Sequence, residues 1–265
     1  MLRLTSLVIL LLLLNGTFAL AVPTRITVRV IAKDSKFVGT SMGGALVTIK
    51  DAYSLELLAE GLTSGSTGDT RRIMETPLWS KTPLADEKTA GFTTTIDIDS
   101  PRLIEVTAYG PMANPQGANK VSATQWVVPG KHLTGGDAWL MILPGFAVDV
   151  LAPPAHMRFE GAPQTVNIKA NVVMMCGCPL TPGGPWDADK VEVAALLKRN
   201  GQHMGLLVLH YAGTPSQFEG AMEVREAGVY EATVYAYDPA NGNTGLDSTT
   251  FIINQPMEGS FGEYD

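Results

Sequence analysis

The chain has 265 residues and a formal net charge of −7, and 45% of its residues are hydrophobic. No basic residues cluster into a stripe, so this charge argues against nucleic acid and anionic membrane surfaces as partners. Two cysteines are too few for a scaffold built on disulfides, so the folded regions must be held together by burial of apolar surface.

Residues 1–21 have the three parts of a secretory signal peptide. Arg3 gives a positive start, the apolar run LVILLLLL at residues 7–14 is too short to span a bilayer, and ALA at residues 19–21 is a small-x-small cleavage site. We expect cleavage after Ala21 and export to the periplasm or the extracellular space, with no membrane span in the mature form. An uncleaved membrane anchor is the alternative.

Alternation of apolar and polar residues predicts β-strands along most of the mature chain. The pattern occurs at residues 25–32, 44–50, 92–99, 103–110, 123–128 and 137–143, with turn signals between them. Residues 187–200 could form a helix, but KVEVAALL within them also alternates, and the neighbouring strands favour a strand there. We therefore expect an all-β fold.

Length and strand patterning predict two β-sandwich domains in tandem. About 244 mature residues exceed the usual size of one domain, and the strand pattern stops at Pro144-Gly145 and restarts at Phe146. We assign residues 22–144 to the first domain and residues 145–254 to the second. Residues 255–265 are polar and acidic without periodicity, which is typical of a flexible tail.

The segment at residues 43–70, GGALVTIKDAYSLELLAEGLTSGSTGDT, resembles the opening of carboxypeptidase-regulatory-like domains, which are small transthyretin-like sandwiches. Leu55 stands where that family usually has a turn glycine. The resemblance implies a spacer or adhesion module rather than an activity. Within it, GSTGDTRR at residues 65–72 follows no phosphate-loop pattern, and we expect a solvated hairpin loop. The matching positions are Gly44, Val47, Asp51, Glu60, Thr63 and Gly68.

The segment at residues 227–253, AGVYEATVYAYDPANGNTGLDSTTFII, resembles the last two strands of a bacterial immunoglobulin-like or fibronectin-III-like domain. Gly228, Val229 and Tyr230, followed by Val234, match the tyrosine corner, in which the phenol oxygen bonds backbone upstream of its own strand. An ordinary core tyrosine is the alternative reading of Tyr230. The resemblance extends over residues 145–254.

A seven-strand sandwich of this kind gathers its B–C, C′–E and F–G loops at one end. In this topology, with residues 205–211 threaded as strand C′, strand A begins at that end, so the end should face the first domain, and ligand sites favour such seams. Asx turns that close a long hairpin explain the Asp and Asn residues of DPANGNTGLD at residues 238–247, which do not have the spacing of an EF-hand loop. The residues expected to cluster at the seam are Cys176, Cys178, Asp187, His210, Asp238, Asn241, Asn243 and Asp247.

Cys176 and Cys178 flank a single glycine, and several readings of the motif compete. Their thiolates, with the thioethers of Met174 and Met175, would suit Cu(I), and a strand that persists would put Met174, Cys176 and Cys178 on one face. A local disulfide would join residues near the upper Cα separation for a bridge. Buried thiols without activity and redox catalysis are the other readings.

No catalytic arrangement can be singled out, so enzymatic activity stays open and is not favoured. We expect an exported binding or accessory protein with a protein partner in an extracytoplasmic complex. Handling of copper or another thiophilic metal by Cys176 and Cys178, with His210 nearby, is the main alternative. A thiol–disulfide redox partner ranks third, because its thiolate usually lies at a helix N-terminus.

Overall fold

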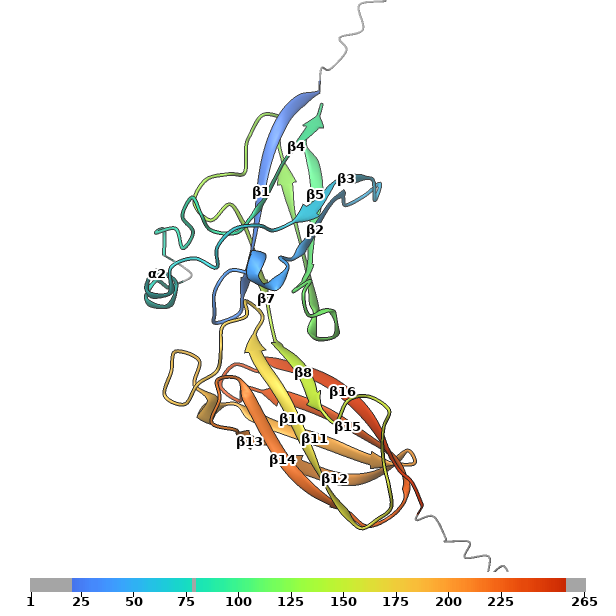
Figure 1. The fold of residues 1–265 in the computed structure, drawn as a ribbon. Coiled ribbons are helices and arrows are strands. Elements are labelled where there is room, and N and C mark those ends of the chain that lie inside the picture. Colours follow the sequence, from blue (N-terminus) through green and yellow to red (C-terminus); the bar gives the residue numbers. More distant parts are fainter. Residues whose placement is uncertain (1–20, 78–79, 256–265) are drawn as a thin grey trace, which may run out of the picture.

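The computed structural model describes residues 21–77 and 80–255, and their strands form two β-sandwiches in tandem (Figure 1). The expected fold class is confirmed. The signal peptide predicted at residues 1–21 and the tail predicted at residues 255–265 fall almost entirely outside the described residues. Within the described part of the chain, no helix is long and apolar enough to cross a membrane.

The first sandwich packs a three-stranded sheet, ordered β4-β1-β7, against a four-stranded sheet, ordered β3-β2-β5-β6. Strand β1 pairs with β4 in antiparallel and with β7 in parallel orientation. On β1 the alternating apolar residues Ile26, Val28 and Val30 are fully buried between the sheets, whereas on β6 Val127 is buried and Trp126 is exposed. Its strands are β1 (Val22–Ala32), β2 (Leu46–Asp51), β3 (Leu57–Leu62), β4 (Phe92–Ile98), β5 (Arg102–Gly110), β6 (Asn119–Val127) and β7 (Trp139–Leu143).

The second sandwich packs the sheet β13-β14-β10-β8 against the sheet β12-β11-β15-β16-β9. This arrangement is immunoglobulin-like, with β8, β10 and β14 in one layer and β11, β15 and β16 in the other. Its strands are β8 (Phe146–Ala152), β9 (Met157–Phe159), β10 (Gln164–Met174), β11 (Glu192–Arg199), β12 (Gln202–Val208), β13 (His210–Tyr211), β14 (Gln217–Val224), β15 (Gly228–Tyr237) and β16 (Thr244–Ile253).

Residues 205–211 do not form the single strand that the sequence predicts. Leu206 and Val208 are exposed on β12, and the next residue, Leu209, is buried. Burial still alternates through these residues, but the pairing partner changes: β12 pairs with β11, whereas His210 and Tyr211 pair with β14 in the opposite sheet. For residues 187–200, the prediction of a strand is correct, and the strand extends from Glu192 to Arg199.

Helical segments are short and lie in the connections. The expected hairpin loop at residues 65–72 leads instead into helix α2 (Thr70–Glu75), because the Asp69 carboxylate accepts from the Arg72 N–H and Ile73 is buried. The other helical turns are η1 (Thr40–Met42), η2 (Pro115–Gly117) and η3 (Ala188–Lys190).

The two sandwiches lie end to end and are joined by the short connection between β7 and β8 (Figure 1). The β10–β11 connection, called the B–C loop here, and the β15–β16 connection, called the F–G loop, reach the first sandwich. There they meet the turn that follows β1, where Lys33 and Asp34 hydrogen-bond to the F–G loop. This junction is the seam.

Candidate functional site

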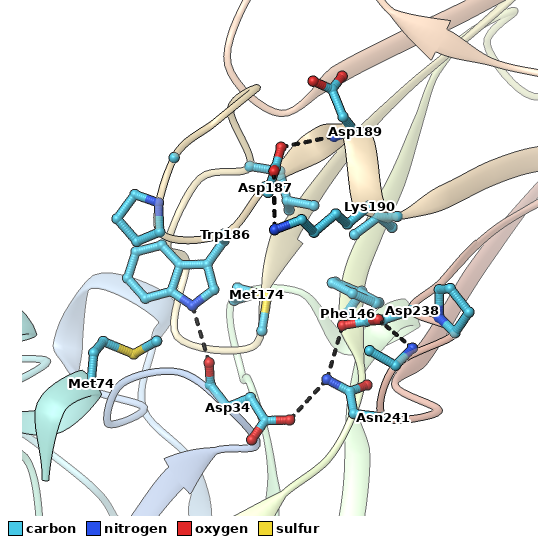
Figure 2. A pocket seen from close by; sticks show the side chains of 16 residues that line it. Asp34, Met74, Phe146, Met174, Trp186, Asp187, Asp189, Lys190, Asp238 and Asn241 are labelled. Carbon is cyan, nitrogen blue, oxygen red and sulfur yellow. Dashed lines mark hydrogen bonds and ion pairs between the residues drawn. The ribbon is translucent and has the colours of Figure 1, made fainter.

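A cavity of about 600 Å³ lies at the seam and takes its walls from both sandwiches (Figure 2). The first sandwich contributes Asp34 and Met74. The B–C loop contributes Trp186 together with Asp187, Asp189 and Lys190, and the F–G loop contributes Asp238 and Asn241. Apolar side chains of the second sandwich, including Phe146, Met174 and Leu180, complete the lining. This volume is in the range of small-ligand pockets.

Asn241 bridges two carboxylates that come from different sandwiches. Its side-chain nitrogen donates to Asp34 Oδ2 at 2.8 Å and to Asp238 Oδ2 at 2.9 Å, as Figure 2 shows. Lys33 Nζ donates to the backbone oxygen of Asn241 at 2.6 Å. Because an amide NH₂ has two hydrogens, both are used in fixing these acidic groups at the rim of the cavity.

Asn243 ties the connection between the sandwiches to the F–G loop. It is 1% exposed, its Oδ1 accepts from the Gly145 N–H at 3.0 Å, and its Nδ2 donates to the Lys33 carbonyl at 3.3 Å. Its own N–H donates to Asn241 Oδ1 at 2.7 Å. Asn243 therefore positions Asn241 from behind the cavity.

Trp186 forms an aromatic wall of the cavity, beside Met74 of the first sandwich (Figure 2). Its indole Nε1 donates to the backbone oxygen of Asp34 at 3.2 Å. This bond fixes the ring edge and uses the only donor of the side chain. What remains available to a ligand is the apolar surface of the ring.

Asp187 shapes the B–C loop from within. Its carboxylate accepts from the Gly183 N–H at 2.9 Å and from the Asp189 N–H at 3.1 Å, and Lys190 Nζ lies 3.5 Å away. The bond from Gly183 is the largest of the effects that lower the pKa of Asp187. Its charge is therefore already compensated, whereas Asp189 is exposed at the rim.

Cys176 and Cys178 form a disulfide inside a tight turn, with their Cα atoms 5.5 Å apart. The strand does not persist through them, so the expected common face of Met174, Cys176 and Cys178 is wrong. Instead the Met174 carbonyl accepts from the Gly177 N–H, the Met174 N–H donates to the Cys178 carbonyl, and Gly177 has a φ of +79°. Such a left-handed residue reverses the chain.

The disulfide is buried at the seam. Cys176 and Cys178 are 1% and 6% exposed, and Ser35 Oγ of the first sandwich lies 3.0 Å from Cys176 Sγ. Met174 lines the cavity, whereas Met175 packs beside Gly145 on another side. The two methionines therefore diverge.

Of the residues expected at the seam, Asp187, Asp238 and Asn241 line the cavity, whereas Cys176, Cys178, Asn243, His210 and Asp247 do not. His210 is exposed on β13, opposite Glu219. Asp247 lies within β16, where its carboxylate accepts from the Val150 N–H at 2.8 Å. Over residues 21–77 and 80–255, no three His, Cys, Asp or Glu side chains converge as a set of metal ligands.

Among the side chains that line the cavity, sequence reasoning missed Asp34, Met74, Trp186, Asp189 and Lys190. Trp186 had a usable signal, since it is a tryptophan in a loop rich in proline and glycine. Asp34 and Met74 had none, because their place depends on how the first sandwich meets the second.

Tyr230 makes the hydrogen bond that defines a tyrosine corner. Its hydroxyl donates to the Glu226 carbonyl at 2.7 Å, the side chain is 1% exposed, and its ring stacks on Phe251 with centroids 5.2 Å apart. Tyr230 is thus a structural residue on the core side of β15, near the opposite end of that strand from the F–G loop.

No protein-family model matches the chain, and no curated protein matches it. Solved structures similar to it include the fibronectin(III)-like modules of Clostridium thermocellum CbhA, with 14% identity, 83% of each chain covered and a TM-score of 0.30. A chimeric titin Z1Z2 structure has 10% identity over 90% of this chain and 99% of its own, with a TM-score of 0.25. A second titin fragment has 10% identity over 89% and 91%, with a TM-score of 0.23. These neighbours have fibronectin-III-like and immunoglobulin-like folds, and the likeness concerns the fold alone.

Proposed function

We propose that this protein is an exported, non-enzymatic binding or accessory module of an extracytoplasmic complex, and that it holds its partner at the seam cavity. The observation that carries the proposal is the composition of that cavity. Its walls come from both sandwiches, and Asn241 joins an acidic group of each. A partner bound there would contact both domains at once.

The compartment and the first sandwich belong to the same proposal. A disulfide between the only two cysteines suits an oxidising space outside the cytoplasm. We take the first sandwich as a transthyretin-like spacer that presents the turn after β1. In support, Leu55 has a φ of 63°, at the position where that family usually has a turn glycine.

Cross-linking in the native compartment tests the proposal. Tagged protein is recovered from the extracytoplasmic fraction of its own host after treatment with an amine-reactive reagent, and the linked peptides are mapped. We expect Lys33 or Lys190 to be linked to one partner protein, and we expect Trp186→Ala to remove those links. The control variant is Trp126→Ala, because Trp126 is 59% exposed on β6.

Two results would overturn the proposal. One is retention of the chain in the cytoplasm. The other is a partner whose cross-links lie elsewhere and survive Trp186→Ala. Turnover of a small substrate by the purified chain would replace the non-enzymatic part of the proposal.

Handling of a thiophilic metal such as copper is a second candidate, favoured by Met42. A Cβ built at Gly177 would lie 2.7 Å from the Met42 sulfur, so a thioether covers the turn that carries both cysteines. Reduction of the disulfide by an external thiol would leave three soft donors around this turn. Elemental analysis of the reduced protein after dialysis against Cu(I) should then give one metal per chain, lost in Cys176→Ser/Cys178→Ser. If the reduced protein without substitutions binds less than one metal ion per chain, this candidate is ruled out.

A further inference from the structure

We propose that the seam cavity binds an organic cation with an apolar stem, that is, an alkylammonium or alkylguanidinium group. The inference rests on the proposed binding role of the cavity and names its ligand class. Such a group could belong to a small amine or to a lysine or arginine side chain of a partner. The experiment separates these two sources.

The charge of the lining is the first argument. Four aspartates and one lysine line the cavity, so 4 × (−1) + 1 gives a net charge of −3. Lys190 lies against Asp187 at 3.5 Å, and the backbone N–H groups of Gly183 and Asp189 also donate to that carboxylate. The acidic groups left for a ligand are therefore those of Asp34, Asp189 and Asp238. A cleft lined by uncompensated charges of one sign raises the local concentration of ions of the opposite sign.

The hydrogen-bonding state of Asp34 and Asp238 is the second argument. Asn241 donates one hydrogen to each and Asp238 Oδ1 also accepts from the Ala240 N–H at 2.9 Å, and each of the two carboxylates keeps further lone pairs. The amide also holds the two groups in place, one from each sandwich. An ammonium has three donors and a guanidinium has five in a planar fork, so either can bond both carboxylates at once.

The apolar wall is the third argument. Trp186 uses its only donor on the backbone oxygen of Asp34, so a ligand meets the ring itself. A cation near an indole face gains the interaction of its charge with the ring quadrupole, and Trp is the strongest of the aromatic residues in this respect. Met74 lies beside the ring and Met174 lies deeper in the cavity, where a methylene stem can pack (Figure 2).

Calorimetric titration of the purified protein tests the inference. The small-molecule probes are agmatine and 1,5-diaminopentane, the peptide probe is acetyl-Gly-Arg-Gly-amide, and the neutral control is 1-pentanol. We expect saturable binding of at least one cationic probe, weakened by added salt, and no binding of 1-pentanol. Agmatine tighter than the peptide indicates a small amine as the natural ligand, and the reverse order indicates a partner side chain.

Substitutions locate the binding. Asp34→Asn should weaken it about tenfold, because the variant removes one charge and keeps a residue that tolerates the left-handed φ of 56° at this position. Trp186→Leu should weaken it by a similar factor, about tenfold, by removing the ring. Asp97→Asn is the control, since Asp97 is exposed on β4 at the far side of the first sandwich, and it should leave the affinity unchanged. Thermal unfolding of each variant verifies that it is folded.

The inference is overturned if no cationic probe binds, or if binding is equal in the parent, Asp34→Asn and Trp186→Leu. Its failure can be told apart from failure of the proposed function. Cross-links at the seam without cation binding would leave the binding role in place and reject the ligand class. Cation binding without such cross-links would support the ligand class and reject the protein partner.

Discussion

At the scale of single residues, Leu55 has an unfavourable backbone conformation for a leucine. Its φ is 63° and its side chain is 65% exposed, so packing does not offset the strain. The left-handed conformation costs an L-residue about 1–2 kcal/mol, whereas glycine loses about 0.5–1 kcal/mol more chain entropy on folding. We expect Leu55→Gly to raise the free energy of unfolding by about 0.5–1 kcal/mol in urea titrations.

The control for this prediction is Leu57→Gly. Leu57 is 55% exposed and begins β3 two residues later with an extended backbone, so glycine there should lower stability. Equal losses in the two variants would show that the turn at Leu55 is not strained.

The hydroxyl of Tyr230 should contribute measurably to the free energy of unfolding. Tyr230→Phe keeps the ring on Phe251 but leaves the Glu226 carbonyl without the hydroxyl that donates to it at 2.7 Å. We expect a loss of about 1–2 kcal/mol in the free energy of unfolding, the range for an unpaired, partly buried polar group. Tyr237→Phe, on the outer face of the same strand, should change the unfolding midpoint little. Equal midpoints for the two variants would contradict the structural role of Tyr230.

At the scale of elements, the alternation of apolar and polar residues located most of the strands, because one face of a half-buried strand is apolar and the other is polar. On β10 the alternating apolar residues Val166, Ile168, Ala170 and Val172 are all at most 1% exposed. Alternation failed where pairing partners decide the structure. Strand β9 has three residues in parallel with β16, and β13 has two, which is too short for any period to show.

The Cys-Gly-Cys turn is an element that the bridge is expected to stabilise only slightly. A disulfide between residues two apart closes a very short loop and removes little entropy from the unfolded chain. We expect Cys176→Ser/Cys178→Ser to fold and to lose no more than about 2 kcal/mol in chemical unfolding.

Gly177→Ala is the contrasting variant for this turn. Its Cβ would lie 2.7 Å from the Met42 sulfur at a φ of +79°, so it should cost more stability than loss of the bridge. A double serine variant that cannot fold would show instead that the bridge is essential to the structure.

The contact between η2 and β8 should make stability depend on pH. Burial is the main cause that raises the pKa of Asp149 above 3.8, and nearby Asp247 adds to it, against hydrogen bonds from Asn114 and Gln116. The charged form is thus disfavoured in the folded state. The resulting penalty is absent well below pH 3.8 and develops as pH rises through the folded-state pKa.

Asp149→Asn removes this penalty, so its stability relative to the parent should increase as pH rises from 3.8 through the raised folded-state pKa of Asp149. Asp187→Asn is the opposite case. The pKa of Asp187 is lowered below 3.8, chiefly by the Gly183 N–H, so the parent gains stability relative to that variant as pH rises toward 3.8 and holds it above. Unfolding free energies across the pH range measure both, and parallel profiles for the two variants would contradict the assignment.

At the scale of the whole molecule, the sequence located one side of the seam only. Loops that carry Asp187, Asp238 and Asn241 follow from the sandwich topology of the second domain, and they do line the cavity. The opposing Asp34 is separated from Asn241 by 207 positions. Sequence periodicity cannot predict such a contact, because the contact depends on how the two sandwiches pack against each other.

Asn243 is the residue expected to control that meeting. Its side chain accepts from the Gly145 N–H and donates to the Lys33 carbonyl, so it joins the connecting segment, the F–G loop and the first sandwich. Asn243→Ala would leave the Gly145 N–H unpaired where it is buried, at a cost of about 1–3 kcal/mol. The backbone N–H that donates to Asn241 Oδ1 remains in this variant, so what is lost is the side-chain link from the F–G loop to the Gly145 N–H and the Lys33 carbonyl.

We therefore expect Asn243→Ala to loosen the seam as well as to lower stability. Small-angle scattering should give a larger radius of gyration than the parent, and the affinity of the seam cavity for its ligand should fall, because the F–G loop that carries Asp238 is no longer tied through Asn243 to the Lys33 carbonyl beside Asp34. Thr249→Val is the matched control. Thr249 Oγ1 donates to the Pro153 carbonyl at 2.9 Å within the second sandwich, so this variant should lose stability with an unchanged radius of gyration. If Asn243→Ala and Thr249→Val scatter alike, the orientation of the sandwiches is set by other contacts, of which the bond from Asn114 to Asp149 at 2.7 Å is the next to remove.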